Sequence, residues 1–145
     1  MALKTRIFTT GILLRSGKLL ILKRKEDDDT YPGMWDCLGG HFEKGESAEE
    51  CMIREAKEES GLDVKIVKSG PLLKYTDEYG AAISVPFVIR SYSGRVSLTE
   101  HSEFKWVDPA KVRRYRVVPD LLMALDAFGL ATPDWKSRNR HDDAR

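Results

Sequence analysis

The sequence predicts an α+β protein, arranged as an α/β/α sandwich, and three observations support this fold class. Short runs of β-forming residues recur along the chain and are separated by turn residues. Two segments carry the apolar spacing or the capping signals of a helix. The 145 residues contain no internal repeat and no interdomain linker. We therefore expect one domain over residues 1–131, followed by a polar C-terminal tail at residues 132–145.

A β-hairpin is predicted near the start of the chain. Arg6 to Leu14 is rich in β-forming residues, and a turn leads from it to a second apolar run, Leu19 to Leu22. The polar segment from Glu26 to Gly33 is predicted as a loop. Trp35 to Leu38 is a short strand candidate that two glycines end.

The helix that follows carries the clearest signals in the sequence. Ser47 and Glu50 have the spacing of a capping box, in which each side chain satisfies a backbone N–H of the first turn. Strong helix formers run from Ala48 to Glu59, and Gly61 stands where a C-terminal cap glycine belongs. We therefore expect a helix over these residues.

The second half of the chain predicts five strands and one further helix. The strand candidates are β-forming runs bounded by Ser, Gly, Pro or Asp residues. The helix is predicted over Val118 to Phe128, because its leucines fall on one face. The strand candidates are Val64 to Val67, Leu72 to Tyr75, Ala82 to Tyr92, Arg95 to Leu98 and Phe104 to Val107.

The charge of the chain is nearly balanced, with 24 basic residues, 23 acidic residues and a net charge of +1. This balance argues against a nucleic-acid or membrane-surface binder, which normally carries a basic excess. No segment reaches the ~20 apolar residues of a membrane span. Cys37 and Cys51 cannot form a disulfide framework, and the scattered histidines do not indicate a zinc site. We expect a cytoplasmic protein that binds neither nucleic acid nor membrane.

Three glutamates of the first predicted helix point to a hard divalent cation. Glu55, Glu58 and Glu59 are spaced i, i+3 and i+4, so they lie within an arc of about 100° on one face. Like charges at this spacing repel each other, and more strongly when they are partly buried. A cation relieves this repulsion, and an all-carboxylate site suits Mg²⁺ or Mn²⁺ better than zinc or copper. The glutamates alone favour the other interpretation, a solvated acidic helix face, because helix surfaces are commonly charged.

The residues around these glutamates favour the metal site. Gly40 is followed after five residues by Glu46 and, after seven more, by the run from Arg54 to Leu62. A random window matches these fixed identities with odds of about 10⁻⁸, at roughly 7% for each identity. The spacing resembles the signature box of the Nudix hydrolase superfamily, with every fixed position occupied. The resemblance implies a Nudix fold, with a mixed central sheet and a box that forms a loop, a helix and a second loop.

The resemblance also implies a role for each box residue. The three glutamates would be the main ligands of Mg²⁺, with Mn²⁺ as a substitute, and the Gly40 carbonyl would be a backbone ligand. Arg54 is expected to orient the glutamates in the catalytic site, and Glu46 to close the loop onto the helix. Gly39 and Gly40 are expected to serve the substrate site through their backbone, by positive φ or close approach.

Residues outside the box leave alternatives open. The general base is a box glutamate, Glu100 or Glu103, and both later acids are otherwise exposed loop residues without a role. Trp35 precedes the box on a segment that lines the base pocket in relatives, so it either stacks on a nucleobase or belongs to the core. Arg24, in the basic run after the second predicted strand, either contacts phosphates or is a solvated charge.

The box predicts a reaction and leaves the substrate open. By resemblance we expect magnesium-dependent hydrolysis of a phosphoanhydride bond in a nucleotide, first of all a nucleoside triphosphate such as an oxidised purine dNTP, to a monophosphate and pyrophosphate. The alternatives are a dinucleoside polyphosphate, ADP-ribose, and a binding module without catalysis. Tyr79 resembles a tyrosine of dinucleoside polyphosphate hydrolases, but the predicted turn from Asp77 to Gly80 places it in solvent. Dimers are common in the superfamily, and a homodimer stays open because no exposed apolar stripe requires one.

Overall fold

The computed structural model of the chain describes residues 4–91 and 93–130, and the predicted C-terminal tail at residues 132–145 lies outside them. The strands are β1 (Arg6–Arg15), β2 (Lys18–Lys23), β3 (Trp35–Asp36), β4 (Lys65–Ser69), β5 (Leu73–Asp77), β6 (Gly80–Arg90) and β7 (Glu103–Val107). The helices are α1 (Ala48–Ser60), the 3₁₀ helix η1 (Pro109–Arg114) and α2 (Pro119–Ala127). None of the helices in these ranges is long and apolar enough to cross a membrane.

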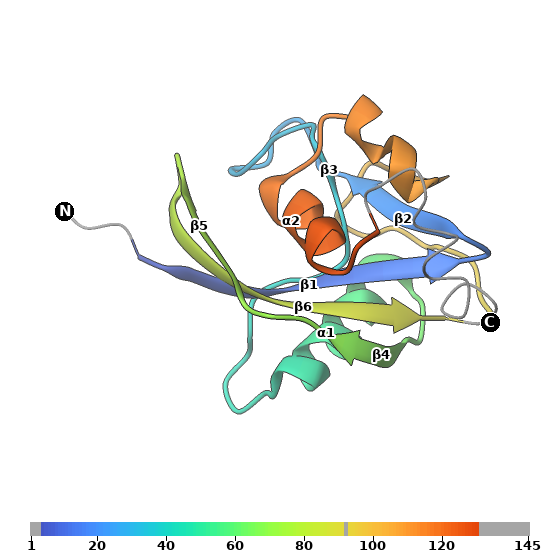
Figure 1. Ribbon diagram of the computed structural model, residues 1–145, viewed down its shortest axis with the longest axis horizontal. Helices are drawn as coiled ribbons and strands as arrows, with labels where there is room; N and C mark the ends of the chain where they lie inside the picture. Colours follow the sequence, from blue (N-terminus) through green and yellow to red (C-terminus); the bar gives the residue numbers. More distant parts are fainter. Residues whose placement is uncertain (1–3, 92, 131–145) are drawn as a thin grey trace.

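A mixed sheet forms the middle of the molecule (Figure 1). In the described part of the chain it has seven strands, in the order β3-β2-β1-β6-β4, with β5 beside β6 and β7 beside β2. β1 and β6 run parallel, and the other strand pairs are antiparallel. Helix α1 packs on one face of the sheet and α2 on the other (Figure 1). The α+β class and the α/β/α sandwich are thereby confirmed.

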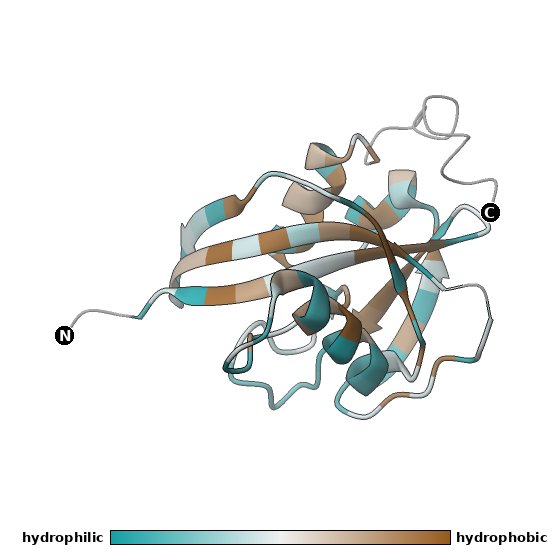
Figure 2. Ribbon diagram, turned by 90° about the horizontal axis from the view of Figure 1, so that it is seen from below, coloured by the Kyte–Doolittle hydropathy of each residue, from teal (hydrophilic) through white to brown (hydrophobic). Residues whose placement is uncertain are grey.

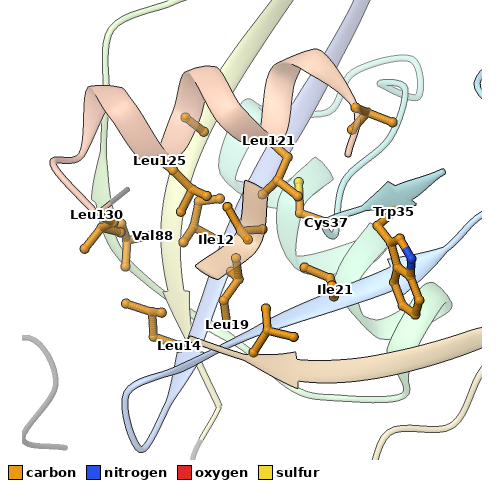
Figure 3. Close-up of a cluster of buried hydrophobic side chains, with 14 of the residues drawn as sticks. Ile12, Leu14, Leu19, Ile21, Trp35, Cys37, Val88, Leu121, Leu125 and Leu130 are labelled. Carbon is orange, nitrogen blue, oxygen red and sulfur yellow. The ribbon is translucent and has the colours of Figure 1, made fainter. Parts of the chain in front are cut away.

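The central strands are buried on both faces because their side chains alternate between two apolar clusters. On β1, Ile12 and Leu14 pack on the α2 side, whereas Leu13 packs on the α1 side. Residues 19–22 of β2 alternate in the same way. In Figure 2 the brown hydrophobic residues gather along the strands, and Figure 3 shows the cluster beneath α2. This double burial makes β1, which runs through the middle of the sheet, a firmly packed element.

Helix α1 begins and ends where its capping residues predict. The Ser47 hydroxyl accepts a hydrogen bond from the Glu50 N–H at 3.1 Å, and the Glu50 carboxylate accepts one from the Ser47 N–H at 2.9 Å. At the other end Gly61 is left-handed, with a φ of 76°. The face that packs on the sheet carries the buried Met52 and Ala56. The predicted start of this helix is confirmed, and its end lies one residue further along.

Most other predicted elements are confirmed to within two residues at each end, but the strand predicted over Arg95 to Leu98 is wrong. Its apolar side chains pack against the α1 cluster, yet its backbone pairs with no strand. Instead, the Ser97 N–H donates to the Ser60 carbonyl at 2.8 Å, and so satisfies the end of α1. The residue pattern also did not predict η1, whose first turn is capped by the Asp108 carboxylate.

A glycine bend between β3 and the helix yields a first prediction. Gly39 has a φ of +146°, and a Cβ added there would lie 2.0 Å from the Thr9 carbonyl oxygen. We expect Gly39→Ala to lower the free energy of unfolding by about 3 kcal/mol or more, because strain and a backbone clash add together. Gly45→Ala is the matched control: its φ is +82° but its surroundings are open, so we expect a loss of about 1 kcal/mol. Urea unfolding measures both, and equal losses would contradict the account.

Candidate active site

A cavity of about 330 Å³ lies between the two helices and the end of the sheet. Because α1 and α2 pack on opposite faces of the sheet, the cavity has two different sides. The α1 side carries Glu55, Glu58 and Glu59, and the α2 side carries Tyr31, Tyr75, Val118 and Asp120. The other lining residues are Arg6, Phe8, Thr9, Arg24, Thr30, Asp36, Cys37, Leu38, Gly39, Gly40, His41 and Glu100.

The three glutamates of α1 differ in burial. Glu59 is 7% exposed, and its carboxylate accepts a hydrogen bond from the Gly39 N–H at 2.9 Å. Burial raises the pKa of Glu59 well above its usual range, although the Gly39 N–H opposes this effect. Glu55 is partly buried, and burial raises its pKa against the opposing effect of Arg54. Glu58 lies at the exposed edge of the same face.

Arg54 joins these glutamates to the loop that precedes the helix. Its guanidinium donates to Glu46 at 2.5 and 3.0 Å, to Glu55 at 2.7 Å and to Glu58 at 3.1 Å. The hydrogen bond from Arg54 lowers the pKa of Glu46 to about 2. Arg54 also donates to the His41 carbonyl at 3.0 Å. These contacts give Arg54 the geometry of an orienting residue, because its donors are directed at the loop and at the glutamates.

Of the two later acids, only Glu100 lines the cavity. Its negative charge adds to the effect of burial in raising the pKa values of Glu55 and Glu59. The neighbouring Thr99 hydroxyl donates to the Glu58 carbonyl at 2.9 Å, which places this segment beside α1. Glu103 is exposed at the start of β7, outside the cavity lining. The geometry therefore favours Glu100 over Glu103 as the acid outside the box.

Gly40 lies against the carboxylate of Glu55, and its backbone is not in the left-handed region. A Cβ at this position would lie 2.3 to 2.8 Å from the carboxylate of Glu55. The Gly40 carbonyl accepts hydrogen bonds from the backbone N–H of Thr9 at 3.0 Å and from its hydroxyl at 3.4 Å. This oxygen is therefore directed at β1, and its part as a metal ligand stays a prediction.

Trp35 lies in the core and not at the cavity, so the structure supports the second of its two interpretations. Its side chain belongs to the cluster beneath α2 (Figure 3), and the residue is 7% exposed. Its ring packs edge-to-face on Tyr115, with the centroids 5.8 Å apart. The sheet explains this position, because β3 pairs with β2 and turns Trp35 toward the same cluster as Ile21.

Arg24 does line the cavity, but it is not a solvated charge. Its guanidinium pairs with Asp36 at 2.8 Å and with Asp28 at 3.0 Å. It also donates to the carbonyl and the hydroxyl of Thr30, at 2.8 Å each. Arg24 therefore holds the loop after β2 against β3, and a phosphate would have to share it with two carboxylates.

Tyr79 does not lie in solvent, contrary to the prediction from its turn. The turn forms as predicted between β5 and β6, but Tyr79 folds back onto Tyr31. The two rings meet edge-to-face with centroids 4.9 Å apart, and the Tyr31 N–H donates to the Tyr79 hydroxyl at 3.1 Å. The Tyr31 hydroxyl donates to Asp77, which also pairs with Arg6 at 2.5 Å. This network joins the loop after β2 to the β5–β6 hairpin.

The α2 side contains a buried carboxyl group that no sequence motif indicated. Asp120, in the first turn of α2, is 7% exposed. Burial and then the negative charge of Asp36 raise its pKa to about 7, although a hydrogen bond from Thr10 opposes them. In the sequence Asp120 looks like an ordinary acid near a helix start. Because side chains alternate along a strand, Asp36 could have been predicted to point away from the core if Trp35 points into it. No signal in the sequence linked Asp36 to Asp120.

A family model of the NUDIX domain matches residues 5–127. The chain belongs to the Nudix family. This Nudix hydrolase is 25% identical over 124 residues to a CTP pyrophosphohydrolase of Escherichia coli, which covers 81% of this chain and 87% of the relative. An ADP-ribose pyrophosphatase of Methanocaldococcus jannaschii is 35% identical over 91 residues, 59% of this chain and 51% of the relative. A MutT NUDIX hydrolase structure from Burkholderia pseudomallei superimposes with a TM-score of 0.75, at 20% identity over 86% of this chain and 98% of that one.

Nudix hydrolases generally use divalent metals, and two clusters in this cavity differ in how well they fit one. Asp36, Cys37 and Asp120 have ligand atoms within 4.8 Å of one another. This cluster includes the thiol of Cys37, a soft sulfur donor whose pKa is raised by burial. The glutamates of α1 fit a hard cation better, because they offer oxygen donors only and repel each other.

The raised pKa of Asp120 predicts how stability depends on pH. The pKa is about 7 in the folded protein and about 3.9 in an unfolded chain. Between these values the folded state binds the extra proton, so stability falls as pH rises, by up to about 1.4 kcal/mol for each pH unit. Asp120→Asn removes this contribution. We expect its free energy of unfolding to rise relative to wild type from pH 4 to pH 7.

The control for this measurement is Asp126→Asn, which changes an exposed acid on the same helix. Urea unfolding at pH 4, 5, 6, 7 and 8 gives the comparison. Parallel pH dependences of wild type and Asp120→Asn would contradict the assignment of the titrating proton to Asp120.

Proposed function

We propose that this Nudix hydrolase cleaves nucleoside triphosphates to a nucleoside monophosphate and pyrophosphate. One observation carries the proposal: a single cavity joins a cluster of carboxylates on its α1 side to aromatic rings and a carboxyl on its α2 side. The first side suits the cation that accompanies a polyphosphate. The second side suits a nucleoside, which has a flat ring and a hydrogen-bonding edge.

On the α1 side, Glu55, Glu58 and Glu59 would hold magnesium, or manganese in its place. The bound cation would neutralise the polyphosphate and make a water molecule more acidic. The chain's own contribution is to fix the carboxylates before the substrate arrives. The Gly39 N–H holds Glu59, and Arg54 holds Glu55 and Glu58.

Glu100 is our candidate for the general base, because it lines the cavity near the glutamates of α1. In the proposed reaction, water adds to phosphorus and the bond from that phosphorus to its bridging oxygen breaks. The proton of the water is taken up by a carboxylate, and the electron pair of the broken bond stays on the leaving phosphate. Glu100 is exposed to solvent, so the attacking water can reach its carboxylate.

On the α2 side, the rings of Tyr31 and Tyr75 offer surfaces for a nucleobase. Tyr31 has a φ of +47°, a conformation that costs free energy for a residue with a side chain. Its hydroxyl bond to Asp77 and its contacts with Tyr79 hold it there. Several contacts thus keep Tyr31 in an unfavourable backbone conformation at the wall of the cavity. This supports a part for Tyr31 in binding the nucleobase.

A panel of nucleotides with Mg²⁺ tests the proposal. The E. coli relative named for CTP supports nucleoside triphosphates as the first group, with CTP, dCTP and an oxidised purine dNTP as members. The relative named for ADP-ribose supports ADP-ribose as the second candidate. Diadenosine tetraphosphate completes the panel. Release of pyrophosphate from a triphosphate is the expected result, whereas cleavage of ADP-ribose alone would replace the proposed substrate.

Substitution of the glutamates tests the metal site. We expect Glu58→Gln and Glu59→Gln each to lower kcat/KM by about 10²-fold or more, because an amide is a poorer ligand for a hard cation than a carboxylate. Glu49→Gln is the matched control, since Glu49 is exposed in the first turn of the same helix. Activity that survives both substitutions would end the metal-site hypothesis. A wild type that binds nucleotides but cleaves none of the panel would favour a binding module.

A further inference from the structure

Three polar side chains meet in the core where apolar ones would be expected. Thr10 lies on β1, Ser84 on β6 and Asp120 on α2, and their exposed fractions are 0%, 0% and 7%. The Thr10 hydroxyl donates to a carboxylate oxygen (Oδ2) of Asp120 at 2.9 Å. The hydroxyls of Thr10 and Ser84 are 2.5 Å apart. Burying hydroxyls costs free energy unless they are hydrogen-bonded. The fold alone does not require polar side chains at these positions, so a role of this chain of hydroxyl groups in the cavity would account for them.

The number of protons determines the direction of the chain. A hydroxyl has one proton to donate. When Thr10 donates its proton to Asp120, Ser84 must donate to Thr10. Each member then has a partner, and the chain runs from β6 through β1 to one oxygen of the carboxyl group. The two hydroxyl groups and the carboxyl group thus form one hydrogen-bonded unit that joins β6, β1 and α2.

Apart from Thr10, the Asp120 carboxyl has a hydrogen bond from its own backbone N–H. Asp36 repels it, Tyr75 and Cys37 interact with its charge, and Arg24 attracts it. Arg24 is already paired with Asp36. Among the described residues, Thr10 is the only one whose side chain forms a hydrogen bond with the Asp120 carboxyl.

We propose that Thr10 and Ser84 are positioning residues, whose hydroxyl chain holds the carboxyl group of Asp120 in place for contact with the nucleoside part of the substrate. The inference rests on the proposed function, because it assigns the nucleoside to the α2 side of the cavity. Neither hydroxyl touches the substrate. Both act through Asp120, which does line the cavity.

Thr10→Val tests the proposal, because valine keeps the shape of threonine and removes its hydroxyl. The hydrogen bond from Thr10 lowers the pKa of Asp120, so its loss should raise that pKa, by about one pH unit for a bond to a charged group. A ¹³C NMR titration of the carboxyl group in the protein without substrate measures this. We also expect KM for the best triphosphate to rise about 10-fold, with kcat within about two-fold of wild type.

Two further variants keep the test decisive if Thr10→Val does not fold. Thr10→Ser restores a hydroxyl and should return both quantities toward wild type. Ser84→Ala removes only the second donor and should shift both in the same direction by less. Thr76→Val is the control, since Thr76 is an exposed threonine on β5. A merely structural role would change the free energy of unfolding and the Asp120 titration without changing KM.

The outcomes separate this inference from the proposed function. An unchanged titration of Asp120 in Thr10→Val overturns the hydroxyl chain, whatever the enzyme cleaves. A raised pKa with an unchanged KM for a triphosphate that the wild type hydrolyses overturns the positioning role. A wild type that cleaves no triphosphate defeats the proposed function, and the NMR titration then still decides whether Thr10 controls the carboxyl group.

Discussion

The glutamates of α1 share one face of a short helix and repel each other. The surrounding structure has to offset this repulsion for the helix to pack where it does. Burial on that face strengthens the repulsion, because a low dielectric screens charges poorly. The Gly39 N–H and the guanidinium of Arg54 offset part of it by hydrogen bonding to Glu59, Glu55 and Glu58. The remaining negative charge faces a cavity. The loop before the helix therefore takes part in the same electrostatic interactions as the proposed cation site.

The sheet supplies the rigid frame that this arrangement needs. β1 is buried on both faces along residues 12–14. Earlier in the same strand, Thr9 lines the cavity and Thr10 is fully buried next to it. Thr9 binds the glycine bend through its backbone and its hydroxyl, whereas Thr10 binds Asp120 on α2. Successive residues of a strand point to opposite faces. One strand thus connects the α1 side of the cavity with the α2 side.

Local signals predicted the elements that local interactions build. Helix α1 was predicted almost to its ends, because its capping box and its cap glycine are contacts between near neighbours in sequence. The segment from Arg95 to Leu98 has the composition of a strand, but it forms no strand pairing in the described part of the chain. Its Ser97 N–H binds the end of α1 instead. Composition indicates that a segment is buried, and tertiary contacts decide which backbone partner it has.

The two sides of the cavity differ in the same way: one is built by local contacts and the other by tertiary contacts. The α1 side could be predicted because its glutamates and Arg54 lie within six residues of one helix. The α2 side could not, because Tyr31, Tyr75 and Asp120 come from three distant segments that only the folded sheet brings together. In the proposed function, the residues for the reaction are thus close together in sequence, whereas those for the nucleoside come from distant segments of the fold. Substitutions on the α2 side should therefore change which nucleotide binds while leaving the carboxylates of α1 in place, since the two groups share no hydrogen bond in the described residues.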